Sequence, residues 1–229
     1  MAADDPESQI DLTARRPIAA RGAAWAGWMA ASLGSRGVTP NAVSVTSVLM
    51  AGAGGVAIGV TAVTGNIVAA VLLVLGVLAI VLRSLCNLLD GMIAVEGGRA
   101  TASGPIFNDL PDRVSDVVLF VGAGYAASVS FQWGATLGWV AAVAALLTAY
   151  VRVLGATLGL SHDFRGPMAK PHRMAVLGVA CAGAAVERLM VGSAFAVSAG
   201  LVLVFVGCVL TTALRLSAAV RVLEHRDDP

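Results

Sequence analysis

Long apolar stretches constrain the fold of this chain more than any other feature. A helix needs about 20 residues to cross the hydrocarbon layer of a membrane, and the sequence divides into stretches of that order. They run approximately over residues 41–63, 66–95, 104–128, 133–159, 173–190 and 193–223. Because 58% of the 229 residues are hydrophobic and only 13% are charged, water is a poor solvent for most of the surface. The sequence therefore predicts an all-α integral membrane protein with six transmembrane helices, which form one domain over residues 39–224.

The N-terminal region has a different composition. Residues 1–11 are polar and acidic, which predicts a disordered tail. Residues 12–38 interleave arginines with Trp25 and Trp28, a pattern typical of an amphipathic helix that lies in the membrane interface with its aromatic rings at headgroup depth. An ordinary amphipathic packing helix is the alternative for this segment.

Basic residues fall mainly on one side of the predicted spans. That side holds Arg15, Arg16, Arg21, Arg36, Arg99, Arg165, Lys170, Arg173, Arg215, Arg221 and Arg226. The turns on the opposite side hold Arg188 alone. The basic side is expected to be cytoplasmic, so we predict a multi-pass protein of the cytoplasmic membrane with both termini inside. The net charge of +1 gives no sign of a nucleic-acid partner, and none is expected.

Two of the predicted helices each carry a stripe of polar or small residues at helical spacing. The members are Asn87, Asp90, Gly91 and Ala94 on the second span, and Asn108, Asp112 and Asp116 on the third. We expect the two stripes to face each other. A carboxylate in mid-membrane costs about 2.5–3.5 kcal/mol, so these acids must face the protein interior, a wet cavity or a metal. Oxygen ligands suit Mg²⁺ or Mn²⁺, and a polar network that only holds the helices together is the alternative.

The spacing of these residues resembles the signature of the CDP-alcohol phosphotransferases, D-x2-D-G-x2-A-R-x8-G-x3-D-x3-D. Its eight fixed positions are occupied here by Asn87, Asp90, Gly91, Ala94, Val95, Gly104, Asn108 and Asp112. Five of the eight agree in identity. Pro40 and Asn41 are similar to the Pro-Asn turn that opens the first span in this family, and the basic stretch 165–173 is similar to the one that follows the fourth. The resemblance implies a homodimer of six-span subunits.

The resemblance also implies a reaction, in which an alcohol attacks a CDP-linked lipid such as CDP-diacylglycerol and CMP leaves. It assigns the general base to Asp112 and the metal ligands to Asp90, Asp112, Asn87 and Asn108. Nucleotide binding falls to Gly91, Ala94, Gly104 and Asn41, and acceptor binding to Arg152, Lys170 and Arg173. Glycerol phosphate, inositol phosphate, serine and another phospholipid all offer a hydroxyl and are the candidate acceptors.

The departures from the signature affect the metal first. The family holds two divalent cations with four carboxylates, whereas Asn87 and Asn108 stand here in place of the first and third. The two remaining aspartates favour one ion, with the asparagine carbonyls as weaker ligands. A catalytically inactive homologue that binds a CDP-lipid or a partner subunit is the main alternative. A transporter is a further one, although the acids gather near one end of the spans, whereas an ion path needs them toward both.

Overall fold

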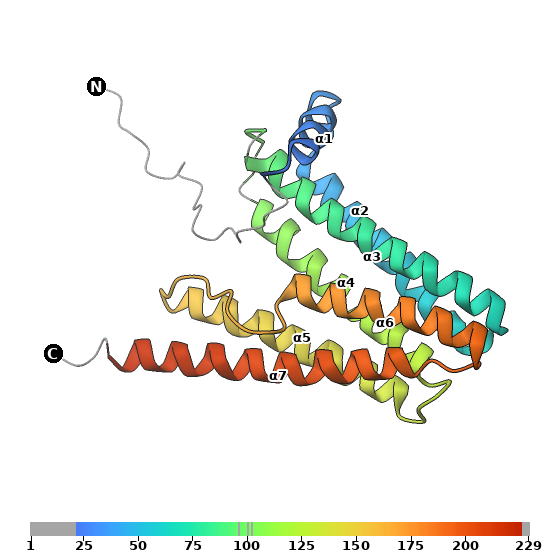
Figure 1. Cartoon of the computed structure of the whole chain (residues 1–229). Helices are drawn as coiled ribbons and strands as arrows, with labels where there is room; N and C mark the ends of the chain where they lie inside the picture. Colours follow the sequence, from blue (N-terminus) through green and yellow to red (C-terminus); the bar gives the residue numbers. More distant parts are fainter. Residues whose placement is uncertain (1–21, 96, 100, 102, 226–229) are drawn as a thin grey trace, which may run out of the picture.

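The computed structural model describes residues 22–95, 97–99, 101 and 103–225. In these ranges it is helical without strands (Figure 1). The helices are α1 (Ala24–Ser35), α2 (Pro40–Val60), the short 3-10 helix η4 (Thr61–Val63), α3 (Asn66–Val95), α4 (Gly104–Ala127), α5 (Gly134–Thr157), α6 (Lys170–Met190) and α7 (Phe195–Glu224). The predicted tail, residues 1–11, and the first part of the predicted interfacial helix, residues 12–21, lie outside the described residues.

Local sequence signals explain where the helices around the polar stripes begin and turn. The Thr39 hydroxyl caps α2 by accepting a hydrogen bond from the Ala42 backbone N–H at 3.2 Å. Pro40 suits the first turn, because the first backbone N–H groups of a helix have no acceptor within the helix and proline lacks this group. Proline also stands in the first turn of α4 and of α6. Between α3 and α4, Gly98 has a φ of +61°, a left-handed conformation that favours glycine.

The long helices pack as a bundle in which α2 lies along both α3 and α4 (Figure 1). Helix α5 packs against α4 and α7, and α6 packs against α3 and α7. A Cβ atom at Gly122 of α4 would collide with the backbone of Gly55 on α2, and one at Gly55 would collide with Val118 of α4. Small residues thus allow the tight helix contacts that are common in membrane bundles. The remaining interior is apolar around Leu119 and Phe120, which are fully buried.

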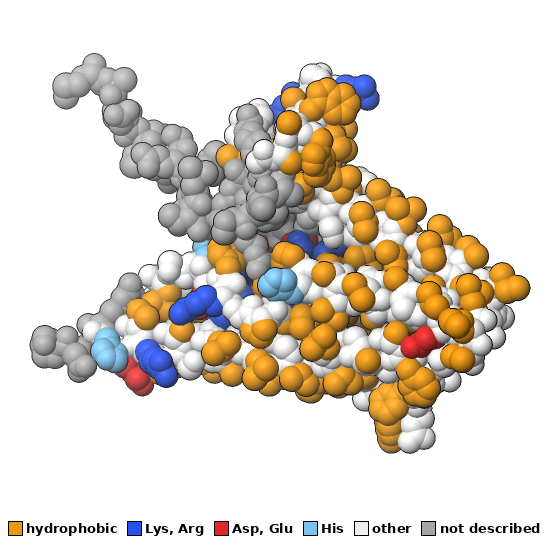
Figure 2. All heavy atoms as spheres, viewed as in Figure 1, with side chains coloured by type: hydrophobic (Ala, Val, Ile, Leu, Met, Phe, Trp, Pro, Cys, Tyr) orange, Lys and Arg blue, Asp and Glu red, His pale blue; other side chains and the backbone are white. Residues whose placement is uncertain are grey.

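The outer surface of the bundle is strongly apolar. Hydrophobic side chains cover most of the face shown in Figure 2. Among the described helices, α2 with η4, α3, α5 and α7 are long and apolar enough to cross a membrane, which supports the prediction of a membrane protein. Helices α4 and α6 have similar lengths but carry more charged residues, so the count of six spans stays a prediction.

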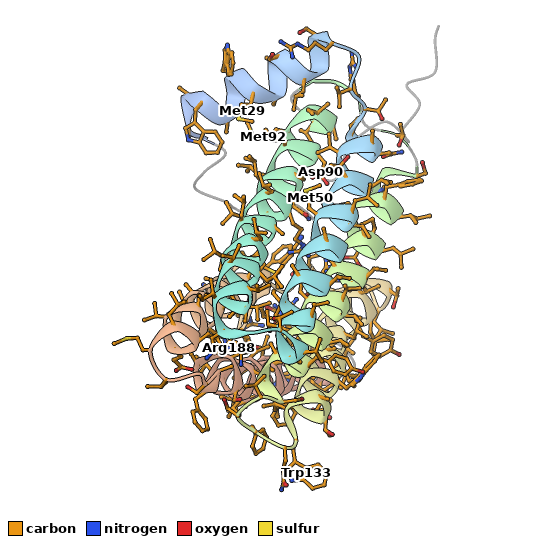
Figure 3. All side chains as sticks on the ribbon, turned by 90° about the vertical axis from the view of Figure 1, so that its right-hand side faces the viewer. Met29, Met50, Asp90, Met92, Trp133 and Arg188 are labelled. Atoms are coloured by element: carbon orange, nitrogen blue, oxygen red, sulfur yellow. The ribbon has the colours of Figure 1, made fainter. Side chains whose placement is uncertain are left out.

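Helix α1 lies across the end of α2 and α3 (Figure 3). Its Ala26 and Ala30 are buried in a small apolar cluster with Met92 of α3, whereas Trp28 on its other side is 72% exposed. One side of α1 therefore packs on the bundle and another is free. Its predicted place in the membrane interface stays a prediction.

Candidate active site

The polar stripes of α3 and α4 meet inside the bundle, as their spacing predicted. The Asn87 side-chain amide donates a short hydrogen bond to Oδ1 of Asp112. One turn earlier on α3, Nη2 of Arg83 lies 3.4 Å from the same Asp112 oxygen and donates to Oδ1 of Asp116 at 3.0 Å. Helices α3 and α4 are therefore joined by charged and polar side chains at this level of the bundle.

Asp112 is the most heavily contacted carboxylate of the site. It is 5% exposed, and its Oδ2 forms a close ion pair with Nζ of Lys170 at the start of α6. Nη2 of Arg113 lies 4.0 Å from the same oxygen. Because Oδ1 already faces Asn87 and Arg83, both carboxylate oxygens are engaged by donors of the protein.

Asp90 has a different environment. It lies on α3 toward the end of the bundle that carries α1, whereas Trp133 and Arg188 lie toward the opposite end (Figure 3). Asp90 is 4% exposed, and its Oδ2 accepts a 2.7 Å hydrogen bond from the Ser44 hydroxyl of α2. Its Oδ1 has no hydrogen-bond partner among the described residues, and neither has Oδ1 of Asn87.

These two unpaired oxygens fit the requirement of a hard divalent cation, which takes carboxylate and carboxamide oxygens as ligands. The fit is limited, because both oxygens of Asp112 are engaged. Among the described residues, no three Asp, Glu, His or Cys side chains gather into a group able to hold a metal. Asp90 and Asn87 therefore each offer one unpaired oxygen to a divalent cation.

Asp109 belongs to a neighbouring ion-pair group, which shares Arg113 with Asp112. Its Oδ1 lies 2.6 Å from Nη2 of Arg152 on α5 and 3.4 Å from Nη2 of Arg113. The Arg152 guanidinium in turn lies 5.8 Å from the ring centroid of Phe164. Two arginines therefore balance Asp109, which leaves this carboxylate little capacity to replace the acid missing at position 108.

A cavity of about 540 Å³ opens beside these groups. Its walls come from α3 to α7 and from the segment between α5 and α6. The predicted site residues among its lining are Asn87, Asn108, Asp112, Arg152, Lys170 and Arg173. The lining does not include Asp90, Gly91, Ala94, Gly104 or Asn41. The proposed base and acceptor residues thus share one cavity, and the proposed nucleotide-binding residues lie outside it.

Arg173 combines a place in the cavity wall with a buried network. Its Nη2 donates to Oδ2 of Asp116 at 2.7 Å, and its Nη1 donates to the Thr148 hydroxyl at 2.8 Å. Arg173 and Asp116 are 2% and 1% exposed. The pair therefore joins α6 to α4 behind the wall of the cavity.

Helix α7 fixes the segment that leads into α6. Arg215 donates from Nε to the Arg165 carbonyl at 2.9 Å and from Nη1 to the Thr148 carbonyl at 2.8 Å. The Thr211 hydroxyl accepts a hydrogen bond from the Met168 N–H. These bonds hold residues 165–168, so that Lys170 enters the cavity at the level of Asp112.

Several residues of the site are not predicted from the sequence: Arg83, Ser44, Thr148 and Arg215. Arg83 carried a readable signal, because it precedes Asn87 by four residues and Asp90 by seven and so lies on the same helical stripe. Ser44 and Thr148 look like ordinary small polar residues of membrane helices, and their sequence context gives no such signal.

Comparison with solved structures shows which fold the chain shares. It superposes on phosphatidylinositol phosphate synthase from Mycobacterium tuberculosis, a CDP-alcohol phosphotransferase, solved with CDP-DAG bound, with a TM-score of 0.70 and 22% sequence identity over 86% of this chain and 94% of that chain. The same protein in complex with manganese and citrate gives 0.70 and 22% over 85% and 88%. The apo form gives 0.65 and 22% over 82% and 93%. No protein-family model and no curated protein matches the sequence.

Proposed function

We propose that this protein is a membrane transferase of phospholipid synthesis, which moves a phosphatidyl group from a CDP-linked lipid to an alcohol and releases CMP. The observation that carries the proposal is the meeting of Asn87 and Asp112 at the wall of a cavity that Arg152, Lys170 and Arg173 also line. The fold supports it, because a solved structure that shares this fold has CDP-DAG bound.

The reaction needs a base, because an alcohol is a weak nucleophile at neutral pH. Asp112 accepts the hydroxyl proton, the alcohol oxygen forms a bond to the lipid-side phosphorus, and the bond from that phosphorus to the CMP oxygen breaks. Without substrate, Oδ2 of Asp112 is ion-paired with Lys170. An acceptor with a negative charge draws Lys170 toward itself and frees this oxygen for the proton.

Two different sets of residues bind the two substrates. Arg152, Lys170 and Arg173, which all line the cavity, bind the acceptor. Gly91, Ala94, Gly104 and Asn41 form the nucleotide side, where small residues let a diphosphate approach the helix backbone. These roles follow the family resemblance.

A divalent cation, Mg²⁺ or Mn²⁺, would supply charge neutralisation at the diphosphate. Asp90 and Asn87 would hold it through their unpaired Oδ1 atoms, and Asp112 and Asn108 complete the proposed ligand set. The solved protein that shares this fold supports the proposal of a divalent metal, because one of its structures is a complex with manganese.

Release of CMP from CDP-diacylglycerol tests the function directly. The purified protein is incubated with CDP-diacylglycerol, Mg²⁺ or Mn²⁺, and a panel of alcohols that includes glycerol phosphate, inositol phosphate and serine. We expect CMP to appear with at least one of them. The limited metal ligand set favours a second candidate, an inactive homologue that binds the CDP-lipid or a partner subunit. Lipid binding without CMP release, at every metal concentration and with every acceptor, would establish that candidate instead.

We further propose that α2 to α7 all span the cytoplasmic membrane, with the cavity on the cytoplasmic side, and that the protein is a homodimer. The charges that set α4 and α6 apart include Asp112, Asp116 and Arg173, which are buried and paired in the bundle, so they need not meet lipid. The C-terminus is then cytoplasmic. Alkaline phosphatase fused there is expected to be inactive and a fluorescent protein bright, and the reverse pattern would contradict this orientation.

A further inference from the structure

Arg83 is a charged residue in the centre of the site that the proposed reaction does not use. It lies in α3, a helix otherwise apolar enough to cross the membrane, and it is 0% exposed. Its Nε and Nη1 have no hydrogen-bond partner among the described residues. Burying an arginine with unpaired donors costs free energy. Holding two helices together therefore does not explain Arg83, and its effect on the neighbouring charges is considered instead.

The charges around Arg83 do not balance. Asp112 is paired with Lys170, and Asp116 is paired with Arg173. Arg83 contacts both carboxylates as well. Nη2 of Arg113 also lies 4.0 Å from Asp112, and Asp109 shares it. Four cations therefore contact Asp112 and Asp116, so positive charge is in excess, and the Arg83 guanidinium lies within hydrogen-bond distance of Asp112.

The orientation of Asn87 adds one more donor to the positive charges around Asp112. Its amide nitrogen faces Oδ1 of Asp112, which also faces Nη2 of Arg83. Two donors of the protein therefore occupy Oδ1 of Asp112. The unpaired oxygens lie at Asp90 and Asn87 instead.

We propose that Arg83 takes the place of a second divalent cation: its guanidinium supplies fixed positive charge at Asp112 and restricts the site to one metal ion, held on the Asp90 side. The inference rests on the proposed function, since the cation in question is the divalent metal of the proposed transfer. It makes Arg83 a positioning residue, which acts through Asp112.

Counting bound Mn²⁺ tests this inference without any turnover. The purified protein in detergent is titrated with Mn²⁺ alone, and free Mn²⁺ is measured by electron paramagnetic resonance. We expect one ion per chain in the native protein and still one in Asn87→Asp/Asn108→Asp, because Arg83 continues to hold Asp112. Adding Arg83→Met to this pair is expected to raise the count to two. Two ions in the native protein, or in the variant that keeps Arg83, would overturn the inference.

Two further variants serve as a control and as an alternative to the triple variant. Arg113→Met in the Asn87→Asp/Asn108→Asp background removes an arginine that lies 4.0 Å from Asp112, and the count is expected to stay at one. If the triple variant does not fold, Arg83→Met alone is titrated, and its Mn²⁺ affinity is expected to rise at least tenfold. An unchanged affinity would overturn the inference. Binding of CDP-diacylglycerol, measured on the same samples, reports separately on the proposed function.

Discussion

Asp112→Asn is expected to abolish CMP release while CDP-lipid binding stays within a few-fold of the native value. The substitution keeps the size of the side chain and its contact with Asn87, but an amide cannot accept the hydroxyl proton. Loss of a general base typically lowers a rate by about 10²–10⁴-fold. Turnover is followed as CMP release under saturating lipid and acceptor, and binding is followed by calorimetry with CDP-diacylglycerol.

Two other aspartates serve as controls for Asp112. Asp109→Asn changes a carboxylate that is paired with Arg152 and Arg113, so its effect is expected to fall on the acceptor KM more than on kcat. Asp90→Ala removes an unpaired Oδ1 and is expected to lose metal and CDP-lipid binding together. If Asp112→Asn turns over at the native rate, Asp112 is not the base. Normal metal affinity in Asp90→Ala would remove Asp90 from the metal site.

Helix positions could be predicted well from the sequence, because span length and local breakers set them. The stretch 66–95 coincides with α3, and 104–128 differs from α4 by one residue. The start of α6 was placed three residues late, at Arg173, because Lys170, Pro171 and His172 look like a polar loop. Proline suits the first turn of a helix, and the ion pair with Asp112 gives Lys170 a partner inside the bundle.

Long-range pairing could not be predicted in the same way. Helical spacing showed that Asn87 and Asp112 lie on facing stripes, since both belong to neighbouring helices with a short connection. Spacing cannot tell which acid Arg152 or Lys170 will meet, because this depends on how α5 and α6 pack against α4. The imbalance created by Arg83 became visible only when all partners of Asp112 and Asp116 were known.

Asp116→Ala is expected to destabilise the fold more than any other single change in the site. Asp116 is 1% exposed and lies 2.7 Å from Arg173 and 3.0 Å from Arg83. Its removal leaves the Arg173 guanidinium buried without its carboxylate and increases the excess of positive charge. Breaking a buried ion pair by removing one partner costs about 3–5 kcal/mol. The free energy of unfolding is measured in detergent by chemical denaturation, with helix content as the signal.

The matched control is Asp163→Ala, which breaks the pair between Asp163 and Arg165 near the surface, where the Arg165 side chain is 72% and the Asp163 side chain 22% exposed. Exposed pairs contribute about 0–1 kcal/mol, so this variant is expected to unfold close to the native protein. Asp116→Asn adds a second comparison, because it keeps the size of the side chain and a hydrogen-bond acceptor for one of the two arginines but removes the charge. If Asp116→Ala is no less stable than Asp163→Ala, then the Asp116 network does not hold α3, α4 and α6 together, and the bundle depends on apolar packing alone at this level.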